Sequence, residues 1–161
     1  MKALALGRKR HAGERLKLGE KIQDLALDKL VRDKVRGRFG GRLKALVSGG
    51  APLNPDIGIF FTALGLRLLQ GYGQTETAPV VSVNRASLVK MHTVGPPLLD
   101  TEVKIANDGE ILVRGDLVMQ GYWGKEDETR ETIVDGWIHT GDIGEFDEDG
   151  YLMITDRKKD I

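Results

Sequence analysis

The stretch Leu66-Arg67-Leu68-Leu69-Gln70-Gly71-Tyr72-Gly73-Gln74-Thr75-Glu76 leads from an apolar segment into a glycine-rich hexapeptide. This pattern predicts a buried strand over residues 66–69 and a tight turn over residues 71–76. The two glycines let a ligand approach the backbone, Tyr72 offers a ring for stacking, and Glu76 offers a hard oxygen ligand for Mg2+. An ordinary turn with a chance carboxylate explains the hexapeptide equally well, because short glycine motifs recur by chance.

A strand and a helix are predicted just before this stretch. Residues 43–47 are typical of a short strand, and the glycine-rich loop 48–53 follows them. Asn54 and Pro55 indicate a helix start, with Asn54 as the N-cap. The buried stripe of this helix is expected to contain Ile57, Phe60, Phe61 and Leu64. A strand, a crossover helix and a second strand form the unit of a parallel sheet, which binds ligands beyond the carboxyl ends of its strands. The loops 48–53 and 71–76 are therefore predicted to face each other across one crevice.

The amino-terminal segment is predicted to be helical and is strongly basic. Gly13 and Gly19 favour two helices over one within residues 1–38. The expected helix stripe comprises Leu27, Leu30, Val31 and Val35. Residues 1–44 hold 14 Lys and Arg against 5 Asp and Glu, a charge of +9, which the rest of the chain balances. A solvated helix face is the favoured interpretation, and peripheral contact with an anionic membrane surface stays open.

Short β segments replace the helices in the second part of the chain. The predicted strands are residues 102–106, 110–114, 143–146 and 151–155, with a short charged helix over 125–133. Asn107-Asp108-Gly109 is typical of a hairpin turn between the first two strands. We therefore expect an α/β protein with helices and a partial parallel β/α layer over residues 1–89. A small antiparallel β-barrel-like subdomain is expected over residues 90–155.

Composition excludes several classes of site. The 161-residue chain has no cysteine, so disulfides and thiolate metal sites are excluded. It contains no apolar stretch long enough to span a bilayer, and residues 1–6 are too short for the apolar core of a signal peptide. Aromatic residues are not interleaved with the basic cluster, so no nucleic-acid partner is expected. We expect a cytoplasmic protein, with contact at the inner face of the membrane as the open alternative.

Two charged motifs follow in the second half. Trp137-Ile138-His139-Thr140-Gly141-Asp142 places one carboxylate at a predicted strand end, where it would suit the two hydroxyls of a ribose. A turn aspartate that satisfies its own backbone is the simpler alternative. Asp156-Arg157-Lys158-Lys159-Asp160 groups an arginine with two lysines, which could meet a phosphate or a ribose. A solvated, charged end of the chain explains the second motif equally well.

Taken together, the motifs point to one family. Their order is 48–53, 71–76, 109–115 with Gly121-Tyr122, 137–142 and 156–160. This series resembles the adenylate-forming acyl-CoA synthetases, the superfamily that includes luciferases and peptide-synthetase adenylation domains. The Ser-Gly-Gly-Ala-Pro loop and the Asp-Arg-Lys-Lys-Asp end are most similar to bacterial long-chain fatty acid–CoA ligases. The resemblance runs from about residue 20 to the end of the chain.

The resemblance implies a role for each motif residue. The nucleotide-binding candidates are Gly50, Ala51, Pro52, Gly71, Tyr72, Gly73, Gln74, Thr75, Asp142 and Arg157. The Gly50–Pro52 backbone would line one side of the adenine and Tyr72 the other. Asp142 would bind the ribose hydroxyls with support from Arg157.

The resemblance also implies the catalytic residues and a hinge. Thr75 would touch the adenylate phosphate, and Glu76 would hold the Mg2+ that bridges ATP phosphates. These two residues are the catalytic candidates. Lys159 would lie at the hinge about which a carboxy-terminal domain rotates, and residues 156–161 would begin that hinge.

The implied reaction joins a fatty acid to CoA at the expense of ATP. The carboxylate attacks the α-phosphorus of ATP, and CoA then cleaves the acyl-adenylate. A phosphate-binding loop like that of the family is missing from residues 1–47, and the catalytic lysine would lie beyond Ile161. We therefore expect the central piece of such a ligase, inactive alone and dependent on its amino- and carboxy-terminal parts. An adenine-nucleotide-binding module and a non-catalytic split-gene piece that docks with a partner fragment remain alternatives.

Overall fold

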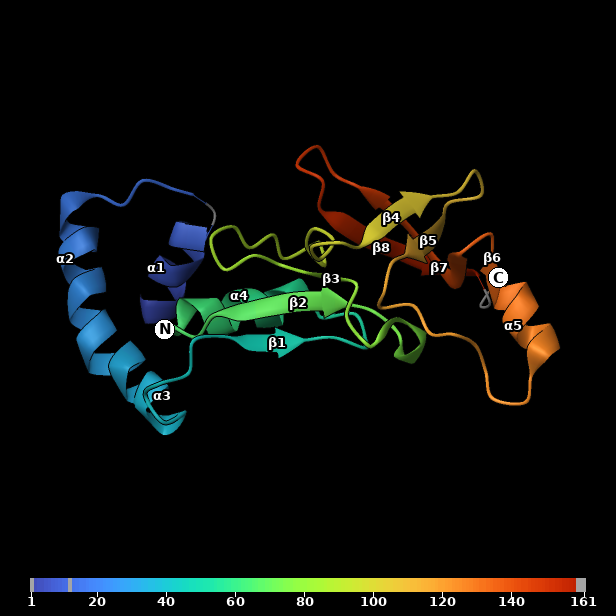
Figure 1. Ribbon diagram of the computed structural model, residues 1–161. Coiled ribbons are helices and arrows are strands. Elements are labelled where there is room, and N and C mark those ends of the chain that lie inside the picture. The colour runs from blue at the N-terminus through green and yellow to red at the C-terminus, as the bar shows by residue number, and fades with distance from the viewer. Residues whose placement is uncertain (1, 12, 159–161) are drawn as a thin grey trace. The chain divides into compact units, whose positions relative to one another are not determined.

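The computed structural model of the chain describes residues 2–11 and 13–158, which form a mixed α/β fold (Figure 1). The chain divides into two units, residues 1–69 and 70–161. The first unit is mainly helical, and the second is built on an antiparallel sheet. The expected α/β class is therefore confirmed. The subdomain boundary at residue 90 stays a prediction.

The first unit begins with two helical segments, as the glycines predict. Helix α1 covers Lys2–His11, and a longer helical segment follows after the loop that contains Gly13. That segment runs through α2 (Leu18–Leu27), the π-helical turn η1 (Asp28–Arg32) and α3 (Asp33–Arg38). The predicted buried stripe is wrong at Leu30, whose side chain is largely exposed. The π turn explains this error, because it changes the helical phase on which the stripe depends.

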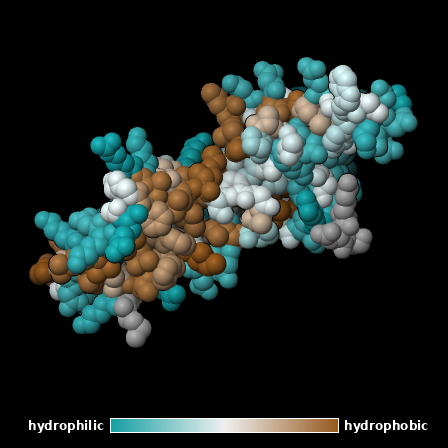
Figure 2. Space-filling model, turned by 90° about the horizontal axis from the view of Figure 1, so that it is seen from below, coloured by the Kyte–Doolittle hydropathy of each residue, from teal (hydrophilic) through white to brown (hydrophobic). Residues whose placement is uncertain are grey.

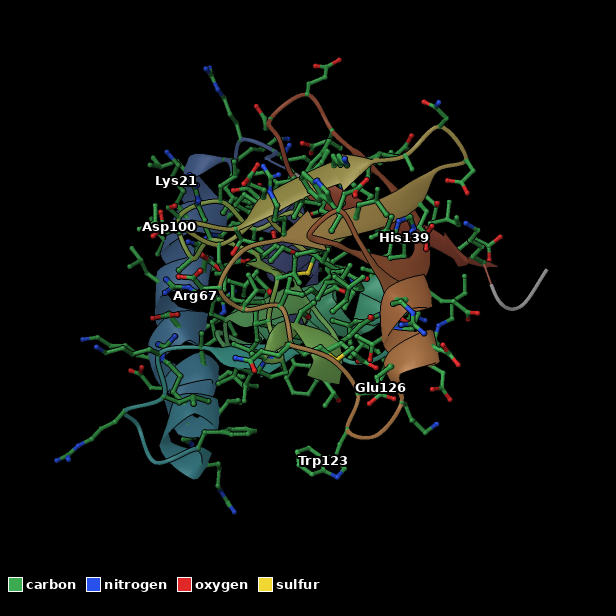
Figure 3. The ribbon with its side chains drawn as sticks, turned by 45° about the vertical axis from the view of Figure 1, so that its right-hand side comes forward. Lys21, Arg67, Asp100, Trp123, Glu126 and His139 are labelled. Carbon is green, nitrogen blue, oxygen red and sulfur yellow. The ribbon has the colours of Figure 1, made fainter. Side chains whose placement is uncertain are left out.

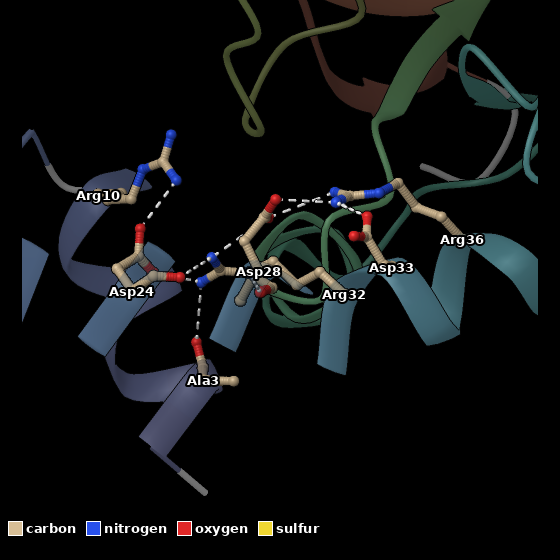
Figure 4. Close-up of polar contacts among 8 residues, drawn as sticks. Ala3, Arg10, Asp24, Asp28, Arg32, Asp33 and Arg36 are labelled. Carbon is tan, nitrogen blue, oxygen red and sulfur yellow. Dashed lines mark hydrogen bonds and ion pairs between the residues drawn. The ribbon is translucent and has the colours of Figure 1, made fainter. Parts of the chain in front are cut away.

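An arginine is the buried centre of the helical unit (Figure 4). Arg32 is 3% exposed, and its Nη2 donates to Asp24 Oδ1 at 2.7 Å. Its Nε donates to the carbonyl oxygen of Ala63 at 2.9 Å, and Nη2 also lies 3.4 Å from the carbonyl oxygen of Ala3. One guanidinium thus joins three helices, and each buried donor has an acceptor, as burial of a charge requires.

The strand–helix–strand unit that the sequence predicts is present. Strand β1 (Leu46–Ser48) neighbours β2 (Leu68–Tyr72), and helix α4 (Pro55–Ala63) connects them. Asn54 is the N-cap as predicted, because its Oδ1 accepts a hydrogen bond from the Asp56 N–H at 2.9 Å.

The buried face of α4 differs from the predicted stripe. Ile57 and Phe60 are partly exposed, whereas Gly58 and Ala63 are buried. Helix α4 instead packs on α1 through small residues. A Cβ atom on Gly7 would lie 2.4 Å from the Cβ of Ala63, so the two helices approach too closely for a larger side chain there.

Strand β2 extends further than the sequence predicts. Gly71 and Tyr72 belong to the strand, where they pair antiparallel with Val83 and Ser82 of β3 (Ser82–Val83). The predicted turn over residues 71–76 is therefore confined to its second half. There the chain forms the short 3-10 helix η2 (Thr75–Thr77). Hydrogen bonding to β3 holds the first half extended, and the layer is consequently not purely parallel.

A five-stranded antiparallel sheet forms the rest of the second unit (Figure 1). Its elements are β4 (Glu102–Ile105), β5 (Glu110–Arg114), β6 (Ile133–Val134), β7 (Trp137–Phe146) and β8 (Leu152–Arg157), with helix α5 (Glu126–Thr132) before β6. The order is β4-β5-β7-β6, and β8 also pairs with β7. The predicted hairpin at Asn107–Gly109, the strands predicted over 143–146 and 151–155, and the charged helix are confirmed. The predicted antiparallel pairing is therefore confirmed. The strands that the structure describes form an open sheet, which does not close into a barrel.

A small apolar core holds this sheet together. Its fully buried members are Val81, Ile111, Val113, Ile138 and Leu152. Four residues from the strands β5, β7 and β8 and the loop residue Val81 therefore share one core, which holds the sheet to the loop after β2.

Large apolar side chains remain exposed on the helical unit, over which Figure 2 shows hydrophobic residues gathering. Leu18, Ile22 and Leu25 follow one face of α2 and are between 63% and 78% exposed. In the second unit, Trp123 is fully exposed and points away from the ribbon in Figure 3. Exposed apolar stripes of this kind mark surfaces that contact another protein segment, a membrane or a ligand. Among the described residues, none of the helices is long and apolar enough to cross a membrane.

Candidate functional site

A bulge in β7 shapes the candidate site. On β5, Glu110 pairs with Ile143 and Leu112 pairs with His139. One residue of β5 therefore faces the three residues 140–142 of β7, which are pushed out of the ladder. Gly141 adopts a φ of 72° there, a backbone conformation that glycine accepts without strain. Bulges of this type redirect a side chain next to a binding site.

The bulge lies inside a long strand, whereas the sequence predicts a strand end at this position. Thr140 stabilises it, because its Oγ1 donates to the carbonyl oxygen of Ile111 at 2.7 Å and accepts from the Asp142 N–H at 3.2 Å. A glycine inside a strand pattern is a signal for a bulge and could have revealed it.

The carboxylate of Asp142 is the convergence point of the site. Its Oδ2 accepts hydrogen bonds from the Tyr72 hydroxyl at 2.6 Å and from Gln74 Nε2 at 2.8 Å. Its Oδ1 faces Arg157 Nε at 3.3 Å. The structure thus brings together four predicted site residues, one each from β2, the loop after it, β7 and β8. Tyr72 and Asp142 are 70 positions apart in the sequence.

Gln74 contacts the bulge directly, which its position in a glycine-rich stretch does not indicate. Its Nε2 also donates to the carbonyl oxygen of Thr140 at 2.7 Å, so one amide group contacts both the backbone and the carboxylate of the bulge. Burial, reinforced by the contact with Asp142, raises the pKa of the Tyr72 hydroxyl far above its ordinary value. Tyr72 therefore remains a neutral donor to Asp142 at physiological pH.

Glu76 lies at the second part of the site. Its Oε1 accepts a hydrogen bond from the Tyr122 hydroxyl at 2.8 Å, and its carbonyl oxygen accepts from the Met119 N–H at 2.8 Å. In the sequence Tyr122 is only part of a motif, and no local pattern indicates its contact with Glu76. A half-buried carboxylate held by one oxygen suits a hard cation such as Mg2+. Within residues 2–11 and 13–158, no group of three acidic or histidine side chains could hold a metal alone. A metal at Glu76 would therefore need ligand oxygens from elsewhere, as from nucleotide phosphates.

The glycines of the hexapeptide pack against their own chain. A Cβ on Gly73 would lie 2.1 Å from the carbonyl oxygen of Pro79, and one on Gly71 would lie 3.1 Å from that of Ser82. The space beside these two glycines is thus occupied by backbone atoms of the same chain. The expectation that these two glycines leave room for a ligand does not follow from the geometry.

A buried glutamate that the sequence analysis did not select lies beside the bulge. Glu110 is 4% exposed, and its Oε1 accepts from the Gly141 N–H at 2.9 Å. Its Oε2 lies 3.0 Å from His139 Nδ1 and 2.9 Å from Lys158 Nζ. Burial would raise the pKa of this carboxyl group, but the hydrogen bonds from His139, Lys158 and Gly141 outweigh it and lower the pKa. Strand periodicity gave no signal for it, because alternation does not distinguish a buried polar position from an exposed one.

The remaining predicted residues are not joined to this cluster. Gly50, Ala51 and Pro52 lie in the exposed loop after β1, in the first unit, so their position opposite Tyr72 stays a prediction. Thr75 is exposed at the start of η2. Lys159 lies outside the described residues.

Comparison with known proteins identifies what the chain is similar to. The family described as AMP-binding enzyme matches residues 12–123. Over 134 residues the chain is 48% identical to the long-chain-fatty-acid–CoA ligase FadD15 of Mycobacterium bovis, covering 83% of this chain and 22% of that protein. Over 149 residues it is 38% identical to long chain acyl-CoA synthetase 4 of Arabidopsis thaliana, again covering 83% of this chain and 22% of the relative.

Solved structures give the same picture. The chain matches O-succinylbenzoate coenzyme A synthetase (MenE) of Bacillus subtilis, in complex with ATP and a magnesium ion, with a TM-score of 0.68 and 30% identity. That match covers 73% of this chain and 27% of the synthetase. It matches ATP-bound MatB of Rhodopseudomonas palustris with a TM-score of 0.69 and 31% identity, covering 77% and 27%. The chain therefore spans about a quarter or less of the proteins that it matches.

Proposed function

The chain belongs to the AMP-binding enzyme family, and from that premise we propose that it forms the adenosine-binding part of an ATP-dependent long-chain fatty acid–CoA ligase. The observation that carries the proposal is the convergence of Tyr72, Gln74 and Arg157 on the carboxylate of Asp142. The relatives named as long-chain ligases support the substrate class. ATP, Mg2+, CoA and a fatty acid are the proposed ligands of the whole ligase.

The two oxygens of Asp142 are not equivalent, and this suits recognition of a ribose. Oδ2 already accepts two short hydrogen bonds, whereas Oδ1 is approached, among the residues that the structure describes, only by Arg157, whose side chain is 67% exposed. A ribose hydroxyl can therefore reach Oδ1 by displacing a long contact at 3.3 Å. Tyr72 and Gln74 hold the carboxylate in position, and Arg157 remains near enough to assist the sugar contact.

The residues around Glu76 supply the phosphate side of the proposed site. Tyr122 fixes Oε1, which leaves Oε2 as the metal-facing oxygen. A bound Mg2+ would supply charge neutralisation for the ATP phosphates. Thr75 lies next to Glu76 and exposes its hydroxyl for the α-phosphate. The ring of Tyr72 would line one face of the adenine. Adenylate formation depends mainly on positioning and on charge stabilisation, which these groups provide.

The missing parts of the ligase would complete both the site and the surface. A carboxy-terminal domain would follow the hinge at Lys159. The preceding parts would cover the exposed apolar face of α2, which includes Leu18, Ile22 and Leu25. Without these parts the chain alone is expected to form no acyl-CoA from palmitate, ATP and CoA. The exposed face also favours a second candidate function: a split-gene piece that docks with a partner fragment and regains activity only on co-expression with it.

The basic helices give a further membrane proposal. Lys21 and Lys29 are exposed near Ile22 and Leu25 of the same helical segment, which suits a surface of anionic lipid. Flotation with anionic vesicles at low salt should show binding that Lys21→Glu weakens. Absence of binding at low salt would remove the idea.

Calorimetric titration with AMP tests the nucleotide site in the chain itself. Wild-type protein should bind AMP more tightly than 2′,3′-dideoxy-AMP, because only AMP offers hydroxyls to Asp142. Asp142→Asn should weaken AMP binding by at least about tenfold, since hydrogen bonds to a charged group contribute about 1.5–3 kcal/mol. Gln74→Met should reduce the preference for AMP over the dideoxy compound by freeing the carboxylate to rotate.

A matched variant separates this effect from general loss of charge. Glu102→Gln removes an exposed carboxylate from β4 and should leave AMP binding unchanged, because Glu102 forms a surface ion pair with Arg114 and does not contact Asp142. Equal affinity for the two nucleotides in the wild-type protein would contradict the proposed ribose site.

A further inference from the structure

One buried carboxylate lies between the bulge of β7 and the last described residues of the chain. Glu110 has a side chain that is only 5% exposed. One of its oxygens accepts the Gly141 N–H at 2.9 Å, and the other accepts Lys158 Nζ at 2.9 Å. His139 lies in the same group, through Nδ1 at 3.0 Å from Oε2, and Figure 3 shows its place on the sheet. No role is assigned to Glu110 by the proposed nucleotide site.

We propose that Glu110 is a positioning residue that couples the Thr140–Asp142 bulge to the chain segment starting at Lys158. The proposal deepens the proposed function, on which it rests, because that bulge carries the carboxylate assigned to ribose. Glu110 itself would touch no ligand. It would act through Gly141 on one side and through Lys158 on the other.

Two consecutive cationic residues, Arg157 and Lys158, form the contacts on which this coupling depends. Arg157 Nε faces Asp142 Oδ1 at 3.3 Å, and the next residue, Lys158, donates to Glu110 Oε2 at 2.9 Å. The end of β8 is therefore tied to the bulge through two separate carboxylates. A displacement of the Lys158 segment would loosen both ties together. The ribose carboxylate and the backbone beside it would then respond to the positions of Arg157 and Lys158.

The electrostatics agree with this arrangement. Burial opposes the charged form of Glu110, yet three donors surround it and keep its pKa below the ordinary value. The hydrogen bonds that Lys158 donates to the carboxylates of Asp108 and Glu110 raise its pKa, so its amine is held in the charged form. Lys158 Nζ lies 2.7 Å from Asp108 Oδ2, so loss of Glu110 alone would weaken its restraint without removing it.

Lysine labelling tests the coupling without any nucleotide. A short pulse of an acetylating reagent, read by mass spectrometry, reports the reactivity of the Lys158 amine. Amide exchange measured by NMR reports the Gly141 N–H. In Glu110→Gln, labelling of Lys158 and exchange of Gly141 should each rise about two- to fivefold, the range expected for loss of a partly exposed ion pair. Glu102→Gln, which removes a carboxylate from the same sheet, should leave both unchanged.

A variant on the surface keeps the test decisive if Glu110→Gln does not fold. Lys158 is 46% exposed, so Lys158→Met should fold normally. Coupling through Glu110 predicts faster exchange at Gly141, even though Lys158 does not contact that amide. Unchanged Gly141 exchange in folded Lys158→Met, or unchanged Lys158 labelling in folded Glu110→Gln, would overturn the proposal.

Nucleotide then separates the two hypotheses. AMP should slow acetylation of Lys158 in the wild-type protein, and Glu110→Gln should diminish that protection. If AMP does not bind while the nucleotide-free effects appear, the ribose proposal fails and the structural coupling stands. If AMP binds with a preference for the ribose hydroxyls but neither variant shows the nucleotide-free effects, the coupling fails and the nucleotide site stands.

Discussion

The helical unit and the sheet unit each contain a buried aspartate paired with arginine, and the two pairs differ in one respect. In the first pair, the side chains of Asp24 and Arg32 are 10% and 3% exposed. In the second, Asp142 is also 10% exposed but Arg157 is 67% exposed. The two carboxylates are equally buried, but Arg32 is buried with Asp24, whereas the side chain of Arg157 is largely in solvent.

This difference separates a structural ion pair from one that a ligand can enter. Arg32 uses its donors on Asp24 and on backbone carbonyls of two other helices, so nothing can replace it without leaving buried charge. Arg157 makes a single long contact with Asp142 and can move aside at little cost. The chemistry of a carboxylate therefore depends on how its partner is packed, and not on its own burial.

The largest predicted effect breaks the sealed pair. Arg32→Met should lower the free energy of unfolding by about 3 kcal/mol, because it leaves Asp24 buried with only the exposed Arg10 as a partner. Arg157→Met should change it by less than about 1 kcal/mol, since one partner is on the surface. Urea unfolding followed by far-UV circular dichroism measures both.

Arg32→Lys provides the control for this comparison. It keeps the charge but cannot reach Asp24 and two carbonyl oxygens with one planar fork, so it should fall between the wild-type protein and Arg32→Met. If Arg32→Met and Arg157→Met lowered the free energy of unfolding equally, the two ion pairs would be energetically alike, and the distinction between a structural pair and a ligand-accessible pair would be wrong.

A smaller effect concerns the stability of the sheet unit in acid. The pKa of Glu110 is lower in the folded protein than its ordinary value of 4.5, so folding is favoured by its ionised form. This contribution is complete above about pH 4.5 and is lost as the pH falls toward the folded-state pKa. Other carboxyls behave similarly, among them Asp147, whose pKa is lowered by its hydrogen bond with Lys90.

Comparison with a variant isolates the contribution of Glu110. Glu110→Gln should reduce the loss of stability between neutral pH and pH 3, as measured by urea unfolding at each pH. An acid profile parallel to that of the wild-type protein would contradict the lowered pKa of Glu110.

The smallest effect appears in alkali and concerns the neutral donor to Asp142. Burial and the contact with Asp142 raise the pKa of Tyr72, so its contribution is present below pH 10 and is lost only as the pH rises through the folded-state pKa. In a spectrophotometric titration one tyrosine should remain un-ionised well above pH 10 until the protein unfolds. Tyr72→Phe should remove that delayed component. Its persistence in the variant would assign it to another tyrosine, such as Tyr122, whose pKa burial also raises.

The sequence predicted the elements better than the packing of their faces. Asn54 and Pro55 located the start of α4, and Asn107-Asp108-Gly109 located the first hairpin, because capping and turn formation depend on neighbouring residues. The buried stripes failed at Leu30 and Phe60. There the π turn η1 and the close packing of α1 on α4 decide which face is buried.

The candidate site shows the same division. The residues Tyr72, Glu76, Asp142 and Arg157 could be selected from motifs, since those residue types recur with the chemistry of nucleotides and metals. Neither Glu110 nor the role of Gln74 could be selected in this way. Their importance arises from contacts across 31 and 68 positions of sequence, to Gly141 and Asp142 respectively.

By itself, the sequence determined the α/β class, the hairpins, the absence of cysteine chemistry and the residue types available for binding, because these follow from local composition and short-range geometry. Only the tertiary structure decided that β7 bulges at Gly141 and that Glu110 joins the bulge to Lys158. It also decided that the Tyr72 hydroxyl and the Gln74 amide hold the carboxylate of Asp142. Those features depend on strand register and on hydrogen bonds between distant segments. Gly141 within a strand pattern is a signal for a bulge, but no local pattern specifies the register of the bulge or the partners of its side chains.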